Sequence, residues 1–194
     1  LEVVLLGMIL LIAGLGNFGE KYNNTRHNIG FEAIDKLQEN WKTIYNFSKW
    51  KLSPKFNGEL SEGKIAKTKI IMVKPTTYMN NSGIAIKKII EFNKIPYGDI
   101  FVIHDDFDLP FGKIKKSYGR GSAGHKGAES IITALGTKNF TRIRVGINPA
   151  NKKLPPKSLD SFVLAKFTEN EKKEIPDIIK KAASEIDAIV QKSI

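Results

Sequence analysis

Short, continuous apolar runs alternate with segments of helical periodicity along this chain. Ile9–Ala13 and Ile100–Ile103 contain only apolar residues, which is typical of strands buried on both faces. Between them, Phe31–Trp41 carries apolar side chains at helical spacing. Because parallel strands need crossover connections, usually helices, this alternation predicts an α/β fold with a mixed, mostly parallel, twisted sheet flanked by helices.

The same signals predict further elements. They are a hairpin of 56–61 and 64–73 turning at Glu62-Gly63, a helix capped by Ser82 and reaching Phe92, a strand at 113–117, a helix that follows a glycine-rich loop over 118–126 and runs to about Leu135, and a strand at 142–147. Prolines and lysines predict a mobile loop over 148–158. Thr168 and Glu171 form a capping box for a C-terminal helical region, which Pro176 is expected to break or kink.

The chain has 194 residues and no internal repeat or linker, so we expect one domain over residues 8–194. Residues 1–7 are interpreted as an N-terminal extension of uncertain origin, with Met8 as the natural start. The apolar run over 3–13 is too short to span a bilayer and follows no basic segment, so neither a membrane span nor a signal peptide is expected. The lack of cysteine excludes disulfides and thiolate metal sites, and the simplest expectation is a cytoplasmic protein.

The charge balance is strongly basic. The net charge is +11 and the pI is about 9.7, which favours a polyanionic partner such as nucleic acid; the alternative is a lysine-rich solvated surface. Arginine is rare among the 31 basic residues, so its few positions are candidates for sites that need a planar guanidinium. These positions are Arg26, Arg120, Arg142 and Arg144.

Three polar segments, 25–28, 78–83 and 104–110, lie where expected strands and helices begin or end. Loops beyond the carboxyl ends of buried strands are the usual binding site in α/β folds. His27 carries an imidazole, which titrates near neutrality, and the Asp105 carboxylate could fix its tautomer. We therefore expect a hydrolytic site in which His27 is the general base and Asp105 orients it, rather than a purely structural histidine.

Several of these residues have alternative interpretations. Asn17 and Asn80 offer donors and acceptors for a substrate carbonyl or amide, although Asn80 or Ser82 could simply cap a helix. The segment 104–108 has two alternative interpretations to a catalytic one: it could ligate a metal, or it could be a solvated turn. The residues concerned are His104, Asp105, Asp106 and Asp108.

A glycine motif suggests a different function, which we reject. Gly14–Gly19 follows an expected strand and matches G-x-G-x-x-G. However, a dinucleotide site needs a helix that begins within that loop, and residues 22–25 are turn-forming instead. We interpret these glycines as a tight turn that brings Asn17 close to a ligand.

A second glycine-rich loop, residues 119–127, is basic and opens an expected helix. Exposed amides at a helix N-terminus favour anions, so phosphate binding is expected there, with a mobile surface loop as the alternative. The candidate phosphate contacts are Lys113, Lys115, Lys116, Arg120 and Arg144, with Arg142 extending the patch.

Taken together, the motifs resemble one family. They are Gly14-Leu15-Gly16-Asn17, Thr25-Arg26-His27-Asn28, Lys74-Pro75-Thr76-Thr77-Tyr78-Met79-Asn80, His104-Asp105-Asp106, Gly124-His125-x-Gly127 and Arg142-Ile143-Arg144-Val145-Gly146. In this order they resemble the bacterial-type peptidyl-tRNA hydrolases.

The resemblance implies an enzyme that cleaves the ester between a peptide and the 3′ ribose of tRNA, without metal or cofactor and as a monomer. By analogy, His27 is the general base and Asp105 orients it. Asn17 and Asn80 would bind the peptide end, and Tyr22 and Tyr78 would line the cleft. The basic face would hold the tRNA backbone.

Three residues depart from the family pattern. Phe18 replaces a usual proline, and Ser117 lies where relatives often place a phosphate-binding cation, so Lys115 or Lys116 is expected to substitute. Lys126 replaces the asparagine of G-H-N-G, and we expect it to stabilise the oxyanion or bind the 3′-terminal phosphate. Two alternatives remain: a non-catalytic RNA-binding protein on the same scaffold, and a metal-dependent hydrolase of phosphate esters.

Overall fold

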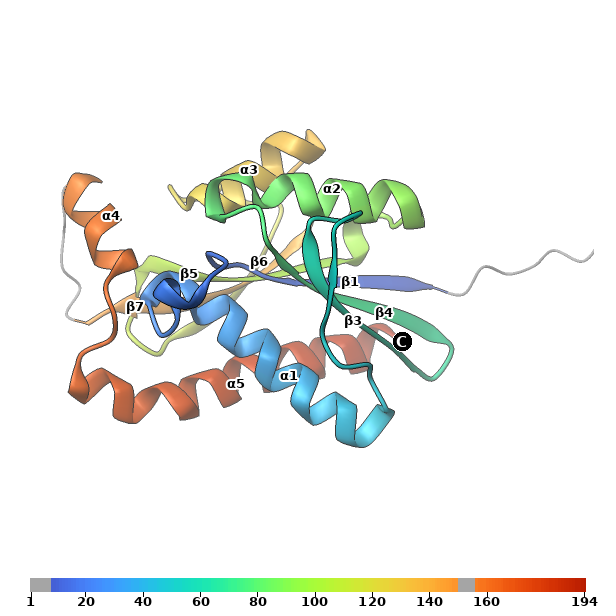
Figure 1. Cartoon of the computed structure of the whole chain (residues 1–194), viewed down its shortest axis with the longest axis horizontal. Helices are drawn as coiled ribbons and strands as arrows, with labels where there is room; N and C mark the ends of the chain where they lie inside the picture. The colour runs from blue at the N-terminus through green and yellow to red at the C-terminus, as the bar shows by residue number, and fades with distance from the viewer. Residues whose placement is uncertain (1–7, 150–155) are drawn as a thin grey trace, which may run out of the picture.

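The computed structural model describes residues 8–149 and 156–194 (Figure 1). In this part of the chain, seven strands form one sheet in the order β2-β3-β4-β1-β5-β7-β6. The central strands β4, β1, β5 and β7 run parallel, while β2, β3 and β6 pair antiparallel at the edges. The strands are β1 (Ile9–Gly14), β2 (Lys51–Ser53), β3 (Gly58–Ile65), β4 (Thr68–Pro75), β5 (Ile100–Pro110), β6 (Ile114–Tyr118) and β7 (Thr141–Asn148).

Helices cover both faces of this sheet, with α2 and α3 on one side and α1 and α5 on the other (Figure 1). The α-helices are α1 (Ile29–Tyr45), α2 (Ser82–Asn93), α3 (Lys126–Leu135), α4 (Pro156–Leu164) and α5 (Glu169–Ser193). Short 3-10 helices are η1 (Glu20–Tyr22), η2 (Arg26–Asn28), η3 (Met79–Asn81) and η4 (Tyr97–Asp99). Among the helices of residues 8–149 and 156–194, none has the length and apolar composition of a membrane span. The predicted α/β class is confirmed.

Strand β1 shows why the apolar runs are continuous. Leu10 and Ile12 belong to the core under α1 and α5, whereas Leu11 and Ala13 belong to the core under α2 and α3. A strand whose alternate side chains enter two cores needs apolar residues at every position. At about 25 cal/mol per Å² of buried apolar surface, such central strands contribute much of the stability.

Several predicted boundaries are wrong. Strand β5 does not end at Ile103: His104–Asp106 continue it by pairing with β7, because parallel pairing satisfies the backbone there. The hairpin turns after Ile65, where Ala66 has φ 52°, and not at Glu62-Gly63. Gly63 lies inside β3, where an added Cβ would approach the Phe47 ring to 2.4 Å.

The helix boundaries also differ in part. Thr168 and Glu171 form the predicted capping box, but Pro176 lies inside an uninterrupted α5. One lost backbone hydrogen bond is outweighed there by the apolar face that α5 buries against the core. Ser82 is the first residue of α2 rather than its cap, since its hydroxyl donates to the Met79 carbonyl. The loop predicted over 148–158 lies mostly outside the described residues, and its end is wrong because α4 begins at Pro156.

Candidate active site

The predicted pair of base and acid is in contact. His27 lies on η2, between β1 and α1, and Asp105 lies on β5, which pairs with β1. The His27 Nδ1 and an Asp105 Oδ1 are 2.8 Å apart. Both residues are buried, so the contact is protected from competing water. Parallel pairing therefore brings together two groups that are far apart in sequence.

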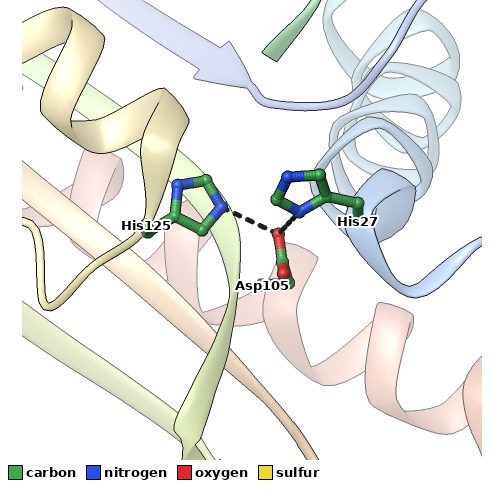
Figure 2. A group of neighbouring side chains, drawn as sticks. All are labelled: His27, Asp105 and His125. Carbon is green, nitrogen blue, oxygen red and sulfur yellow. Dashed lines mark hydrogen bonds and ion pairs between the residues drawn. The ribbon is translucent and has the colours of Figure 1, made fainter. Parts of the chain in front are cut away.

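Asp105 accepts from a second histidine on the same oxygen. The His125 Nε2 is also 2.8 Å from the Asp105 Oδ1 (Figure 2). Burial alone would raise the pKa of Asp105, but the neighbouring His27 and His125 outweigh it and hold the pKa well below its usual range. Asp105 is therefore an ionised acceptor for two ring N–H groups.

These contacts assign the tautomers. The His125 Nδ1 accepts from the Ala128 N–H at 3.1 Å, where His125 caps α3, so its Nε2 carries the proton given to Asp105. His27 likewise donates from Nδ1. Its Nε2 makes no hydrogen bond to any described residue, and His27 lines a cavity of about 340 Å³. A lone pair that faces a cavity in this way can accept a proton from water.

The five predicted substrate-binding residues all line that cavity. They are Asn17, Tyr22, Tyr78, Asn80 and Lys126. Tyr22 and Tyr78 meet edge to face with ring centroids 6.2 Å apart, and Tyr78 has φ 59°, a strained backbone for a tyrosine. Strain of this kind persists only where the surrounding structure holds it, and it is concentrated at functional sites.

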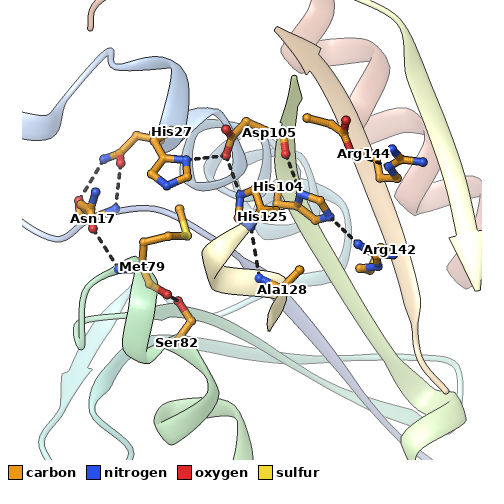
Figure 3. Close-up of polar contacts among 12 residues, drawn as sticks. Asn17, His27, Met79, Ser82, His104, Asp105, His125, Ala128, Arg142 and Arg144 are labelled. Atoms are coloured by element: carbon orange, nitrogen blue, oxygen red, sulfur yellow. Dashed lines mark hydrogen bonds and ion pairs between the residues drawn. The ribbon is translucent and has the colours of Figure 1, made fainter. Parts of the chain in front are cut away.

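Asn17 is fixed from three directions. Its Oδ1 accepts from the Met79 N–H at 2.9 Å (Figure 3). Its backbone N–H donates to the Asn28 side-chain oxygen at 2.8 Å, and its carbonyl accepts from the Asn28 amide at 3.0 Å. The Asn17 amide NH₂ makes no hydrogen bond to the residues that the structure describes. A donor held this rigidly beside His27 suits a carbonyl or oxyanion.

Lys126 lines two cavities beside His27. Its Nζ lies 3.1 Å from the carboxylate of Asp160 on α4. Both side chains are more than half exposed, so this ion pair is weak and its ammonium is available to a stronger anion. The smaller of the two cavities, of about 60 Å³, is also lined by Asp105 and His125.

The predicted phosphate contacts fall into two groups. Lys113, Lys115, Lys116 and Arg120 are exposed on or beside edge strand β6. Arg144 is largely buried and donates from Nε to Asp106 at 2.5 Å. Arg142 does not extend the surface patch, because it is 2% exposed and donates to carbonyls of the glycine-rich loop.

The alternative metal cluster is not assembled. His104 donates to the Asp105 carbonyl, and Asp106 binds Arg144. Within the described ranges, three metal-ligating atoms converge only at His27, Asp105 and His125, all within 4.8 Å. Two N–H···O hydrogen bonds account for that spacing.

Other residues of the site were not predicted from the sequence. His125 belongs to the glycine-rich loop and to the Gly124-His125-x-Gly127 motif, but no role was predicted for it, although its place one residue before a helix is a signal for a cap. Arg26, next to His27, bonds Glu171 at 2.6 Å and the Lys166 carbonyl at 2.9 Å, and it thereby anchors η2 against the start of α5. The rarity of arginine predicted that Arg26 fills a site that needs a guanidinium, but it did not predict this anchoring role.

Comparisons with known proteins agree with this geometry. Residues 11–194 match the family model described as peptidyl-tRNA hydrolase. Curated proteins named peptidyl-tRNA hydrolase are similar: one from Clostridium botulinum (strain Alaska E43 / Type E3) is 40% identical over 96% of this chain and 92% of its own length, and one from Bacillus velezensis is 41% identical over 95% and 93%. The crystal structure of peptidyl-tRNA hydrolase from Acinetobacter baumannii superposes with a TM-score of 0.83 at 34% identity, covering 95% of this chain and 90% of that one. The chain belongs to the peptidyl-tRNA hydrolase family.

Proposed function

We propose that this protein hydrolyses the ester between the carboxyl end of a peptide and the 3′ ribose of tRNA, and releases free tRNA. The observation that carries the proposal is the His27–Asp105 contact of 2.8 Å at the wall of a cavity that also presents Asn17, Asn80 and Lys126. Family membership supports the substrate class. The protein acts as a monomer in the cytoplasm in this proposal.

His27 is the general base. Its Nδ1–H donates a hydrogen bond to the ionised Asp105, so the unprotonated Nε2 takes a proton from the attacking water. As the imidazole becomes charged, the Asp105 carboxylate stabilises it. His125 acts through Asp105, because the hydrogen bond from the His125 Nε2 fixes the same carboxylate oxygen that orients His27. The proton then passes to the leaving 3′ oxygen of the ribose.

The cavity supplies the donors for the developing oxyanion. The Asn17 amide, held by Met79, and the Lys126 ammonium are the candidates, since each can present an N–H to negative charge. Asn80 binds the peptide end, and the Tyr22–Tyr78 pair forms the wall against which the substrate packs. The phosphates of the tRNA lie against the exposed Lys113, Lys115, Lys116 and Arg120, with the largely buried Arg144 as a further contact.

One assay tests this function: hydrolysis of N-acetylaminoacyl-tRNA, compared with unblocked aminoacyl-tRNA, with and without a chelator. Turnover of the blocked ester that resists the chelator supports the proposal. Binding of tRNA without turnover would make this a non-catalytic RNA-binding protein. Turnover that the chelator abolishes would make it a metal-dependent hydrolase.

A further inference from the structure

The proposed mechanism leaves one buried histidine without a role. His104 has no exposed surface, and burial, followed by the neighbouring His125 and Arg142, holds its pKa well below its usual range. The neutral ring donates from Nδ1 to the Asp105 carbonyl at 2.6 Å, so its Nε2 lone pair faces the Arg142 Nη1 at 3.5 Å. A ring enclosed in this way exchanges no proton with substrate, and what it can do is hold its neighbours in place.

The neighbour it packs against is His125. The two ring centroids are 4.3 Å apart, with the planes tilted by 49° (Figure 3). His125 is thus fixed by the N–H of Ala128, by the carboxylate of Asp105 and by the ring of His104. Displacing His104 would therefore shift His125, which is the second hydrogen-bond donor to the Asp105 carboxylate.

Arg142 joins His104 to residues 119–124 of the glycine-rich loop, the part that precedes α3 and its cap. Its Nη2 donates to the carbonyls of Arg120 at 3.1 Å and Gly121 at 2.6 Å. Gly119, Ala123 and Gly124 have positive φ, which interrupts any helix or strand over this segment. A buried guanidinium that bonds two successive carbonyls therefore sets where the loop lies.

We propose that Arg142 and His104 are positioning residues that fix the glycine-rich loop relative to the His125–Asp105–His27 unit. This inference rests on the proposed function, in which Arg120 contacts a tRNA phosphate. A phosphate that binds Arg120 holds the loop backbone whose carbonyls bond Arg142. Arg142 contacts His104, His104 packs against His125, and His125 bonds Asp105, so the bound phosphate stabilises the position of the Asp105 carboxylate. The tRNA backbone thereby accelerates cleavage of its own ester, in addition to improving binding.

The test compares two esters with the same reacting bond, N-acetylaminoacyl-tRNA and N-acetylaminoacyl-adenosine, which has no phosphate. The ratio of their kcat/KM values measures the advantage given by the tRNA backbone. Arg142→Lys should lower that ratio about tenfold, because an ammonium cannot bond two carbonyls and a ring nitrogen in one plane. Arg120→Ala should also lower it, and the double variant should fall less than the product of the two losses.

Arg26→Lys is the matched control. It also replaces a buried guanidinium that bonds backbone carbonyls, but it does not contact the loop. It should lower the melting temperature and leave the ratio unchanged. His104→Phe keeps a ring against His125 and loses both nitrogens. It should lower kcat for both esters without raising KM, and it should lower kcat more for the tRNA ester, so that the ratio falls as it does in Arg142→Lys. This variant carries the test if Arg142→Lys does not fold.

The contrary outcomes are distinct. If Arg142→Lys and His104→Phe change only the melting temperature, both residues are merely structural and the inference is overturned. If the wild-type protein cleaves both esters with equal kcat/KM, the hydrolytic function stands and the inference falls. If it cleaves neither, the proposed function fails and the inference fails with it.

Discussion

Replacing Asp105 by asparagine removes the negative charge at the centre of the site and nearly preserves its shape. One Asp105 oxygen accepts from His27 and His125, both at 2.8 Å. When His27 gains a proton, opposite charges about 4 Å apart interact by about 4 kcal/mol at an effective dielectric constant near 20. Each ~1.4 kcal/mol changes a rate tenfold, so after allowing for solvent on the cavity side of His27 we expect kcat to fall by about 10²- to 10³-fold.

The assay is steady-state release of N-acetyl amino acid from tRNA, which separates kcat from KM. Asp106→Asn is the matched control, since Asp106 is the next residue of β5 and binds Arg144 rather than His27 or His125. It should leave kcat close to that of the wild type. A folded Asp105→Asn variant whose kcat stays within about threefold of the wild type would refute the electrostatic reasoning.

Three further predictions concern stability and binding. Burial, and then the neighbouring Asp35 carboxylate, raise the pKa of Glu32 from 4.5 to about 7. Between these two pH values the folded state therefore binds more protons than the unfolded state. The free energy of unfolding should fall as the pH rises from 4.5 to about 7. Glu32→Gln should remove that slope in urea titrations, and an unchanged slope would contradict the assignment. Gly83→Ala would bring a Cβ within 2.2 Å of the Ser130 carbonyl oxygen, so we expect the free energy of unfolding to fall by about 1–3 kcal/mol. An unchanged urea midpoint would contradict this expectation. Lys115→Ala and Lys116→Ala should each raise KM and reduce the slope of log(kcat/KM) against log[salt] by about one; a slope equal to that of the wild type would remove that lysine from the phosphate contacts.

Local signals in the sequence were sufficient for much of the fold. The apolar runs at Ile9–Ala13 and Ile100–Ile103 became adjacent parallel strands, and the Thr168 capping box opens α5. The contact between His27 and Asp105 was predicted from the rule that polar groups near the carboxyl ends of neighbouring parallel strands meet, although Asp105 lies within β5 and not in a loop beyond it. These features depend on short-range chemistry and one topological rule.

Other features depend on partners that no local pattern specifies. Asp105 and Asp106 are poor strand formers, yet β5 continues through them because His27, His125 and Arg144 satisfy their carboxylates. Pro176 is tolerated because tertiary burial outweighs one missing hydrogen bond. Scarce arginine was an informative signal, but only the structure shows that Arg142 holds a loop instead of meeting solvent.

The measurement that tests the central claim most directly is turnover by His27→Ala, alongside its affinity for deacylated tRNA. General-base catalysis contributes about 10²- to 10⁴-fold, so the variant should lose kcat by that factor while it binds tRNA as tightly as the wild type. If the variant hydrolyses N-acetylaminoacyl-tRNA at the wild-type rate, His27 is not the base.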